Sequence, residues 1–311
     1  MLTQTIILIL GLTLLGIGST LLVVGAASTA IMFAVRPVIV GLTIVAFATS
    51  APELLVSLVA AVKGSGGISI GNILGSNVIN IALVLGISAA IKPIVIKKQI
   101  ITIEIPYMFF VSFIFWVLCL DSYIGRMDGI ILLFLLIIFL IYSFATAKDK
   151  SNHTHTGKPS FFKISKNIFF IIIGIVMLSY GANFVVQEAI VIAEKIGLSQ
   201  IFIGISIVAL GTSLPELATS AVAAAKGESD ISVGNVIGSN LFNICLVMGI
   251  VGVFNPMAID KTLHSFQFPF MMFICLILGL IAYFNEGIGK RTGYFFIGLF
   301  IIYILISYFK G

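Results

Sequence analysis

Long apolar runs separated by short polar stretches dominate the pattern of this chain. Runs long enough to cross a bilayer as helices occur at about ten places. They cover approximately residues 4–27, 37–62, 68–91, 99–120, 127–147, 167–190, 200–225, 231–254, 263–284 and 292–309. The pattern therefore predicts an all-α polytopic membrane protein with about ten transmembrane helices.

One polar connection stands out from the short loops. It spans residues 148–166 and contains KDKSNHTHTGKPS, so it divides the chain into an N-terminal repeat at 1–147 and a C-terminal repeat at 167–311, each with five predicted spans. His153 and His155 in this linker are expected to be solvated rather than metal-bound.

Composition supports a membrane protein and excludes other classes. Charged residues make up 9% of the chain and apolar residues 60%, with a mean hydropathy of +1.23. Soluble proteins carry about 25% charged residues, and disordered chains are still more polar. The three cysteines, Cys119, Cys245 and Cys275, lie in apolar runs and are expected to be buried packing thiols.

The net charge of +5 is better explained by membrane orientation than by binding to nucleic acid. Loops after the odd-numbered spans carry 12 of the 17 lysines and arginines, and the opposite loops carry 5. The positive-inside rule then predicts a multi-pass protein of the cell (plasma) membrane, with the central loop in the cytoplasm and both termini outside.

An internal repeat is the most informative feature of the sequence. Residues 41–87 and 204–250 align at an offset of 163 without a gap, and about 28 of the 47 positions are identical. The shared positions include TS-x-PE and GN-x-x-GSN-x-x-N, which hydrophobicity alone would not preserve. Because each half has an odd number of spans, the two repeats are predicted to be inverted, as in many secondary transporters.

Each repeat places one glutamate, Glu53 or Glu216, near the middle of an apolar span. Burying a carboxylate there is costly unless it is paired or solvated, and no Lys or Arg lies near the centre of any span. An external cation is the expected partner, with a protonated glutamate bonded to a neighbouring helix as the alternative. Glu104 has no counterpart, since position 267 is Gln, and is expected at the membrane interface.

The residues around the glutamates add oxygen ligands. Pro52 and Pro215 lack an amide proton, so nearby carbonyls lose their helical donors. Hydroxyls are expected one turn before each glutamate, on or near its face, unless they bond back to the preceding turn. These hydroxyls belong to Thr49, Ser50, Thr212 and Ser213.

The second motif contributes side-chain amides and further hydroxyls. Its polar residues are Asn72, Ser76, Asn77, Asn80, Asn235, Ser239, Asn240 and Asn243, and each could serve helix packing as well as ligation. A site built from oxygen atoms favours calcium, sodium or magnesium over zinc or copper. Calcium, which takes six to eight oxygens, fits better than magnesium, which keeps its waters.

The paired motifs, AFATSAPE with GNILGSNVIN and ALGTSLPE with GNVIGSNLFN, resemble the alpha repeats of the calcium/cation antiporter superfamily, in its prokaryotic sodium/calcium exchanger branch. The motifs cover roughly a third of the chain, and the ten-span layout extends the resemblance over its length. The resemblance implies four mid-membrane cation sites. Its calcium ligands would be the Glu53 and Glu216 carboxylates with the Thr49 and Thr212 carbonyls.

The same resemblance implies a sodium set around these glutamates. It comprises Ser50, Ser213, Ser76, Ser239 and the carbonyls of Ala46 and Ala209, with Asn80 and Asn243 completing the middle site. Potassium-dependent members have aspartate at the position of Asn243, which argues against potassium co-transport here. The proton-coupled branch typically has a Gly-Asn-x-x-Glu stretch around its acid in place of TS-x-PE. The motif in this chain therefore favours sodium over protons as the counter-ion.

Charge arithmetic supports exchange, because one calcium ion or two sodium ions neutralise two carboxylates. The sequence therefore predicts a secondary active antiporter that exchanges calcium for sodium by alternating access, with proton/calcium exchange at the same site as the alternative.

Other functional classes fit the sequence less well. A channel would need no counter-ion, and an intramembrane hydrolase would need a nucleophile–base pair, which the motifs lack. We expect no enzyme activity, no cofactor beyond the transported ions, no nucleic acid and no obligate protein partner; the partners are inorganic cations and the lipid bilayer.

Overall fold

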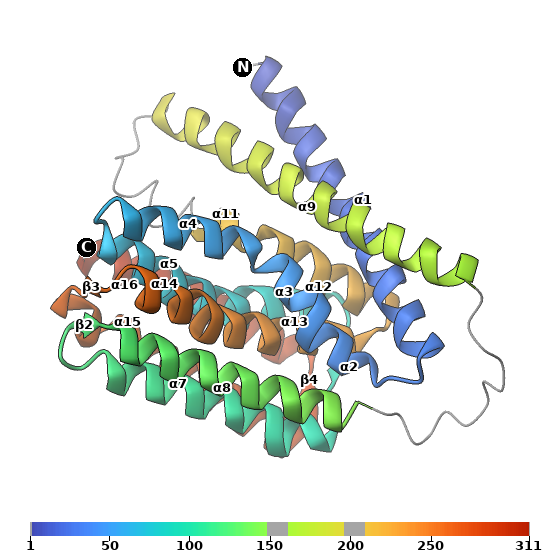
Figure 1. The fold of residues 1–311 in the computed structure, drawn as a ribbon. Coiled ribbons are helices and arrows are strands. Elements are labelled where there is room, and N and C mark those ends of the chain that lie inside the picture. Colours follow the sequence, from blue (N-terminus) through green and yellow to red (C-terminus); the bar gives the residue numbers. More distant parts are fainter. Residues whose placement is uncertain (1, 148–160, 196–208, 311) are drawn as a thin grey trace.

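The computed structural model describes residues 2–147, 161–195 and 209–310 (Figure 1). In these residues, eight helices are long and apolar enough to cross a membrane. A ninth span consists of two helical pieces, Pro37–Thr49 and Ala51–Val62, bent by 43°. The predicted span 200–225 begins outside the described residues. The all-α polytopic class is thus confirmed.

The first half of the chain is helical apart from two short strands. Its elements are α1 (Leu2–Met32), α2 (Pro37–Val40), η1 (Gly41–Val45), α3 (Ala46–Thr49), α4 (Ala51–Val62), α5 (Gly66–Ile79), η2 (Asn80–Leu85), α6 (Gly86–Ile91), β1 (Ile94–Val95), η3 (Ile100–Glu104), α7 (Ile105–Leu118), β2 (Tyr123–Ile124) and α8 (Arg126–Ala145).

The second half presents the same order of elements where it is described. They are α9 (Phe161–Lys195), α11 (Ala209–Thr212), α12 (Leu214–Lys226), α13 (Ser229–Leu241), η5 (Phe242–Met248), α14 (Gly249–Phe254), β3 (Met257–Ala258), η6 (Lys261–Ser265), α15 (Gln267–Asn285), β4 (Gly287–Ile288) and α16 (Lys290–Lys310). Helix α9 begins at Phe161, so the last residues of the predicted linker 148–166 are helical.

Two central spans are surrounded by more exposed ones. In Gly66–Ile91 and Ser229–Phe254, 83% of the most apolar stretch is buried, against at most 44% in the other spans that the structure describes. Long α1 and α9 pack against each other along one side of the bundle, and α7 and α8 lie at the opposite side (Figure 1). The polar repeat motifs therefore lie in the protein interior, where lipid does not reach them.

Close backbone contact at glycine joins the two halves near the motifs. A Cβ atom added at Gly238 of α13 would lie 2.5 Å from the carbonyl oxygen of Leu42 in η1. Only glycine allows the two helices to approach this closely, as is common between membrane helices. The contact places the second motif of one half beside the TS-x-PE segment of the other.

Strand pairs also connect the halves. Strand β1 pairs antiparallel with β4, with Ile94 opposite Ile288, and β2 pairs antiparallel with β3, with Ile124 opposite Met257. Each two-stranded sheet takes one strand from each half, as expected if a pseudo-twofold axis relates them. All three cysteines are buried and unpaired, which confirms their predicted packing role.

Candidate cation-binding site

A break in the second predicted span positions the first glutamate. Helix α3 ends at Thr49, Ser50 leaves the helical region with φ −81° and ψ 3°, and α4 begins at Ala51. Pro52 causes this break because it cannot donate to the preceding turn and favours the first turn of a new helix. Glu53 consequently lies in the first turn of α4 and is fully buried.

The second half repeats this geometry. Helix α11 ends at Thr212, Ser213 has φ −87° and ψ 6°, and α12 begins at Leu214 with Pro215 in its first turn. Glu216 is also fully buried in the first turn of its helix. Both breaks occur where the prolines predict them.

The two half-sites contact each other reciprocally. The Ser50 hydroxyl donates to Oε1 of Glu216 at 3.3 Å, and the Ser213 hydroxyl donates to Oε1 of Glu53 at 3.3 Å. Each serine was expected on or near the face of its own glutamate; its hydroxyl bonds to the glutamate of the other half. The Ser50 amide still donates to the Ala46 carbonyl at 3.0 Å, and its carbonyl accepts from the Leu54 amide at 3.2 Å. Its hydroxyl points to the opposite repeat.

The threonine hydroxyls also cross between the halves. Thr49 contacts Oδ1 of Asn235 at 3.1 Å and the Ser239 hydroxyl at 3.3 Å. Thr212 donates to Oδ1 of Asn72 at 3.3 Å. The Thr49 hydroxyl also lies 3.3 Å from the Ala46 carbonyl, but its single proton can serve only one acceptor and the Asn235 contact is shorter.

The second motif surrounds these glutamates with buried polar groups. Ser76, Asn80, Ser239 and Asn243 are all buried. Asn80 lies at the start of a π-helical turn, η2, and donates to Oδ1 of Asn240 across the repeat interface at 3.1 Å. The structure thus gathers both motifs from both halves, while the use of each residue as an ion ligand stays a prediction.

Several buried oxygens in this cluster have no hydrogen-bond partner in the described part of the chain. They are Oε2 of Glu53, Oε2 of Glu216, the Ser76 hydroxyl and the amide oxygens of Asn80 and Asn243. The two ion pairs among the described residues, Arg36–Glu104 and Lys97–Asp230, leave both site glutamates without a basic partner. Buried acceptors without donors are costly, and a hard cation would satisfy them.

The predicted carbonyl ligands are described unequally. The Ala46 carbonyl accepts the Ser50 amide at 3.0 Å, which leaves one lone pair for another partner. Ala209 is the first residue of α11, and its surroundings lie outside the described region. The described residues contain no group of three or more His, Cys, Asp or Glu, so a softer metal has no ligand set there.

Comparison with known proteins identifies the family of the chain. Residues 3–145 and 166–309 match the family described as sodium/calcium exchanger protein, which covers nearly the whole sequence. The chain belongs to this family. The match includes both repeats, so the reciprocal glutamates lie in the part of the chain that carries the family resemblance.

Relatives of this exchanger-family chain share its full length. It is 32% identical to the inner membrane protein YrbG of Escherichia coli K12, over 99% of this chain and 98% of that protein. It is 29% identical to the sodium/calcium exchanger MaX1 of Methanosarcina acetivorans, over 98% of each chain. The structure of the sodium-calcium exchanger NCX_Mj soaked with sodium and calcium superposes with a TM-score of 0.85 at 34% identity, covering 97% of this chain and 98% of that one.

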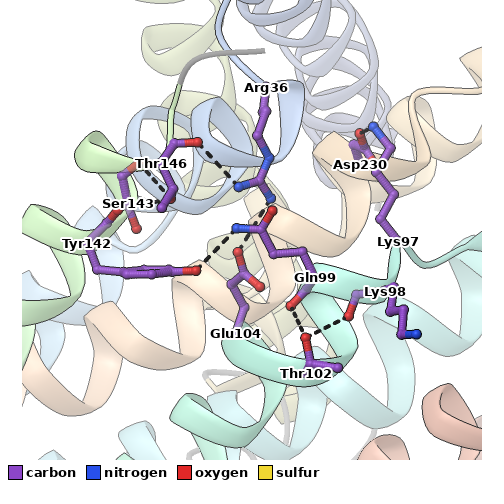
Figure 2. A network of polar contacts seen from close by, with 10 residues as sticks. All are labelled: Arg36, Lys97, Lys98, Gln99, Thr102, Glu104, Tyr142, Ser143, Thr146 and Asp230. Carbon is purple, nitrogen blue, oxygen red and sulfur yellow. Dashed lines mark hydrogen bonds and ion pairs between the residues drawn. The ribbon is translucent and has the colours of Figure 1, made fainter. Parts of the chain in front are cut away.

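A third buried acid of the exchanger fold is bound differently. Glu104 of η3 is 1% exposed and lies 3.5 Å from the Arg36 guanidinium, which also donates to the Thr146 carbonyl (Figure 2). Beside it, Gln99 donates to the Tyr142 hydroxyl at 3.2 Å. Glu104 is therefore a buried acid paired with Arg36, and its expected position at the membrane interface stays a prediction. This pair could not be predicted because Arg36 is far from Glu104 along the chain.

A cavity of 390 Å³ reaches the site from one side of the exchanger fold. It lies between α4, α9 and α11, and Pro52, Asn183 and Thr212 are among its lining residues. Thr212 is the last helical residue before the second break. The cavity therefore borders one of the two half-sites directly.

Proposed function

We propose that this chain is a secondary active antiporter that exchanges calcium for sodium by alternating access at the Glu53–Glu216 site. The observation that carries the proposal is the pair of buried carboxylates, one from each half, each with one unpartnered oxygen and no basic partner among the described residues. Membership in the sodium/calcium exchanger family supports sodium and calcium as the ions.

The charge of the site explains why the two ions would exchange. One calcium ion or two sodium ions neutralise the two carboxylates, and both ions compete for the same oxygens. An empty site would carry two buried negative charges, so it would change orientation slowly and uncoupled transport would be suppressed. If three sodium ions exchange for one calcium ion, one net charge crosses per cycle, which is worth about 2.3 kcal/mol per 100 mV.

The ligand assignment is the one that the resemblance to the calcium/cation antiporter superfamily implies. Glu53 and Glu216 would bind calcium with the Thr49 and Thr212 carbonyls, and sodium with Ser50, Ser213, Ser76 and Ser239. The cavity beside Thr212 borders one half-site. We place the protein in the plasma membrane with the central loop in the cytoplasm and both termini outside, since the cations are concentrated on that side.

The test is calcium uptake into liposomes that contain the purified full-length chain. An outward sodium gradient should drive uptake, and a pH gradient or a potassium gradient alone should not. Glu216→Gln should abolish uptake, whereas Glu104→Gln should retain it if the protein folds. Uptake driven by the pH gradient alone would identify a proton/calcium exchanger, and uptake that needs no counter-ion would identify a channel.

A further inference from the structure

Asn72 of α5 bridges the two half-sites although it is outside the predicted ligand set. Its Nδ2 donates to the main-chain carbonyl of Glu53 at 3.4 Å and to the Ser57 hydroxyl at 3.0 Å. Its Oδ1 accepts the Thr212 hydroxyl of the other half at 3.3 Å. The side chain therefore contacts the first glutamate on one side and the second helix break on the other.

Asn235 of α13 does the same with the roles of the halves exchanged. Its Nδ2 donates to the Glu216 carbonyl at 3.4 Å and to the Ser220 hydroxyl at 2.9 Å. Its Oδ1 accepts the Thr49 hydroxyl at 3.1 Å. Asn72 and Asn235 thus make the same set of contacts in the two halves. Because the set occurs twice, incidental packing explains it poorly.

The chemistry of the partners fixes the direction of each amide. A main-chain carbonyl can only accept, so Nδ2 must face the glutamate carbonyl. Oδ1 must then face the opposite half, where it can only accept from the threonine hydroxyl. Both asparagines are almost completely buried, at 6% and 0% exposure for Asn72 and Asn235, so water cannot readily replace these bonds.

The residue held in this way is the last helical residue before each break. Ser50 and Ser213 follow directly in a non-helical conformation, so the threonine backbone lacks the support of a continuing helix. A bond from the threonine hydroxyl to the neighbouring repeat supplies that support. The carbonyl of the same threonine is the predicted calcium ligand.

We propose that Asn72 and Asn235 are positioning residues that determine calcium affinity by anchoring the threonines whose carbonyls bind calcium. The proposal rests on the proposed exchange function and deepens it. The atoms to which Asn72 is bonded belong to Glu53, Ser57 and Thr212, and none of these is a serine of the predicted sodium set. Loss of the anchor should therefore weaken calcium binding more than sodium binding.

The test uses the full-length chain in liposomes, with radioactive calcium uptake as the readout. Asn72→Ala and Thr212→Val should each raise the KM for calcium about tenfold, while the half-saturating sodium concentration changes by at most about twofold. The double variant should be no worse than the more impaired single variant, because both substitutions remove the same bond. Thr212→Ser keeps the hydroxyl and should restore calcium affinity.

Ser88→Ala is the matched control. Ser88 is buried in the same central span, but among the described residues its hydroxyl donates within that span, to the Val84 carbonyl at 2.7 Å. This variant should leave both ion affinities unchanged. Asn235→Ala repeats the experiment at the other half-site; Thr49→Val is left out because the Thr49 hydroxyl also contacts the predicted sodium ligand Ser239. Size-exclusion chromatography with thermal melting identifies variants that fail to fold.

Two results would overturn the proposal. The first is an equal weakening of calcium and sodium binding in the folded variants, which would indicate general damage to the site. The second is unchanged calcium affinity in Asn72→Ala and Thr212→Val. Absence of sodium-driven calcium uptake by the unmodified protein would instead overturn the proposed function, so the two failures are distinguishable.

Discussion

At the centre of the molecule the two halves of the chain make the same contacts. Ser50 binds Glu216 and Ser213 binds Glu53 at an identical 3.3 Å, and each glutamate lies in the first turn after a proline-induced break. Near the beginning of α7 and α15, corresponding positions make different contacts. The two repeats therefore share their contacts at the central glutamates more closely than their contacts at the periphery.

The difference is clearest at the repeat positions 104 and 267. Glu104 forms an ion pair with Arg36 (Figure 2). Gln267, its counterpart, accepts the Tyr303 hydroxyl at 2.6 Å and donates to Ser307 at 3.2 Å, so its neighbourhood is neutral. The position therefore holds a buried ion pair in the first half and a half-buried, hydrogen-bonded amide in the second.

The comparison separates two meanings of a buried acid. Glu104 carries its own counter-ion within the protein, so it needs no ligand. Glu53 and Glu216 have hydroxyl donors but no basic partner in the described residues, and this is the condition for binding a transported cation. Burial alone does not identify an ion site; the identity of the partner does.

The largest expected effect is loss of transport on removing either central charge. Glu53→Gln and Glu216→Gln should each abolish calcium flux in liposomes, because one remaining carboxylate cannot neutralise a divalent ion. Equal losses would show that the half-sites are functionally equivalent. Substantial calcium exchange by one of the two variants would contradict the symmetric centre.

The next effect concerns stability at the periphery. Glu104→Gln leaves the mostly buried Arg36 without its counter-ion and should lower the free energy of unfolding by about 3 kcal/mol. Thermal melting in detergent measures the loss. The double variant Arg36→Gln/Glu104→Gln should recover much of it, and equal stability of the single variant and the parent protein would refute the structural role of the pair.

Lowering the pH tests the role of the Glu53 and Glu216 carboxylates without any substitution. Protons and calcium compete for the same two carboxylates, so the KM for calcium should rise by up to about tenfold for each pH unit once one carboxylate is largely protonated. Flux measured across a pH series at fixed sodium gives this dependence. The same profile in Glu104→Gln would show that the central pair alone is responsible, whereas a shifted profile would involve the periphery.

The smallest effect concerns Asp260, whose counterpart in the first repeat is Lys97. Hydrogen bonds from the Thr262 amide and hydroxyl lower the pKa of Asp260, which caps η6. A lowered pKa in the folded protein means stabilisation above the ordinary aspartate pKa that is lost as pH falls through the folded pKa. Asp260→Ala should therefore lower Tm slightly at neutral pH, and the difference from the parent should shrink in acid; a pH-independent difference would contradict this origin.

Features with a local cause could be predicted from the sequence. The apolar runs gave the membrane spans, and Pro52 and Pro215 gave the positions of the helix breaks. The gap-free repeat singled out Glu53 and Glu216 because an acid kept twice at mid-span is hard to explain by packing.

Contacts between distant segments could not be predicted in the same way. Whether the Ser50 hydroxyl bonds to Glu53 or to Glu216 depends on how the two halves pack together, which helical spacing within one segment does not specify. The Asn72–Thr212 bond depends on how α5 packs against the other half. The Arg36–Glu104 pair has no repeat mate, so the symmetry that identified the central acids gave no information about it.

The strand pairs that cross between the halves also set an order in which the molecule can be completed during synthesis. A ribosome makes Ile94 long before its partner Ile288, and Ile124 long before Met257. The central site can close once Asn243 has been made, the β2–β3 end follows, and the β1–β4 end closes last. Until then β1 has no partner strand, so the first half cannot complete its connections before the second half has been made.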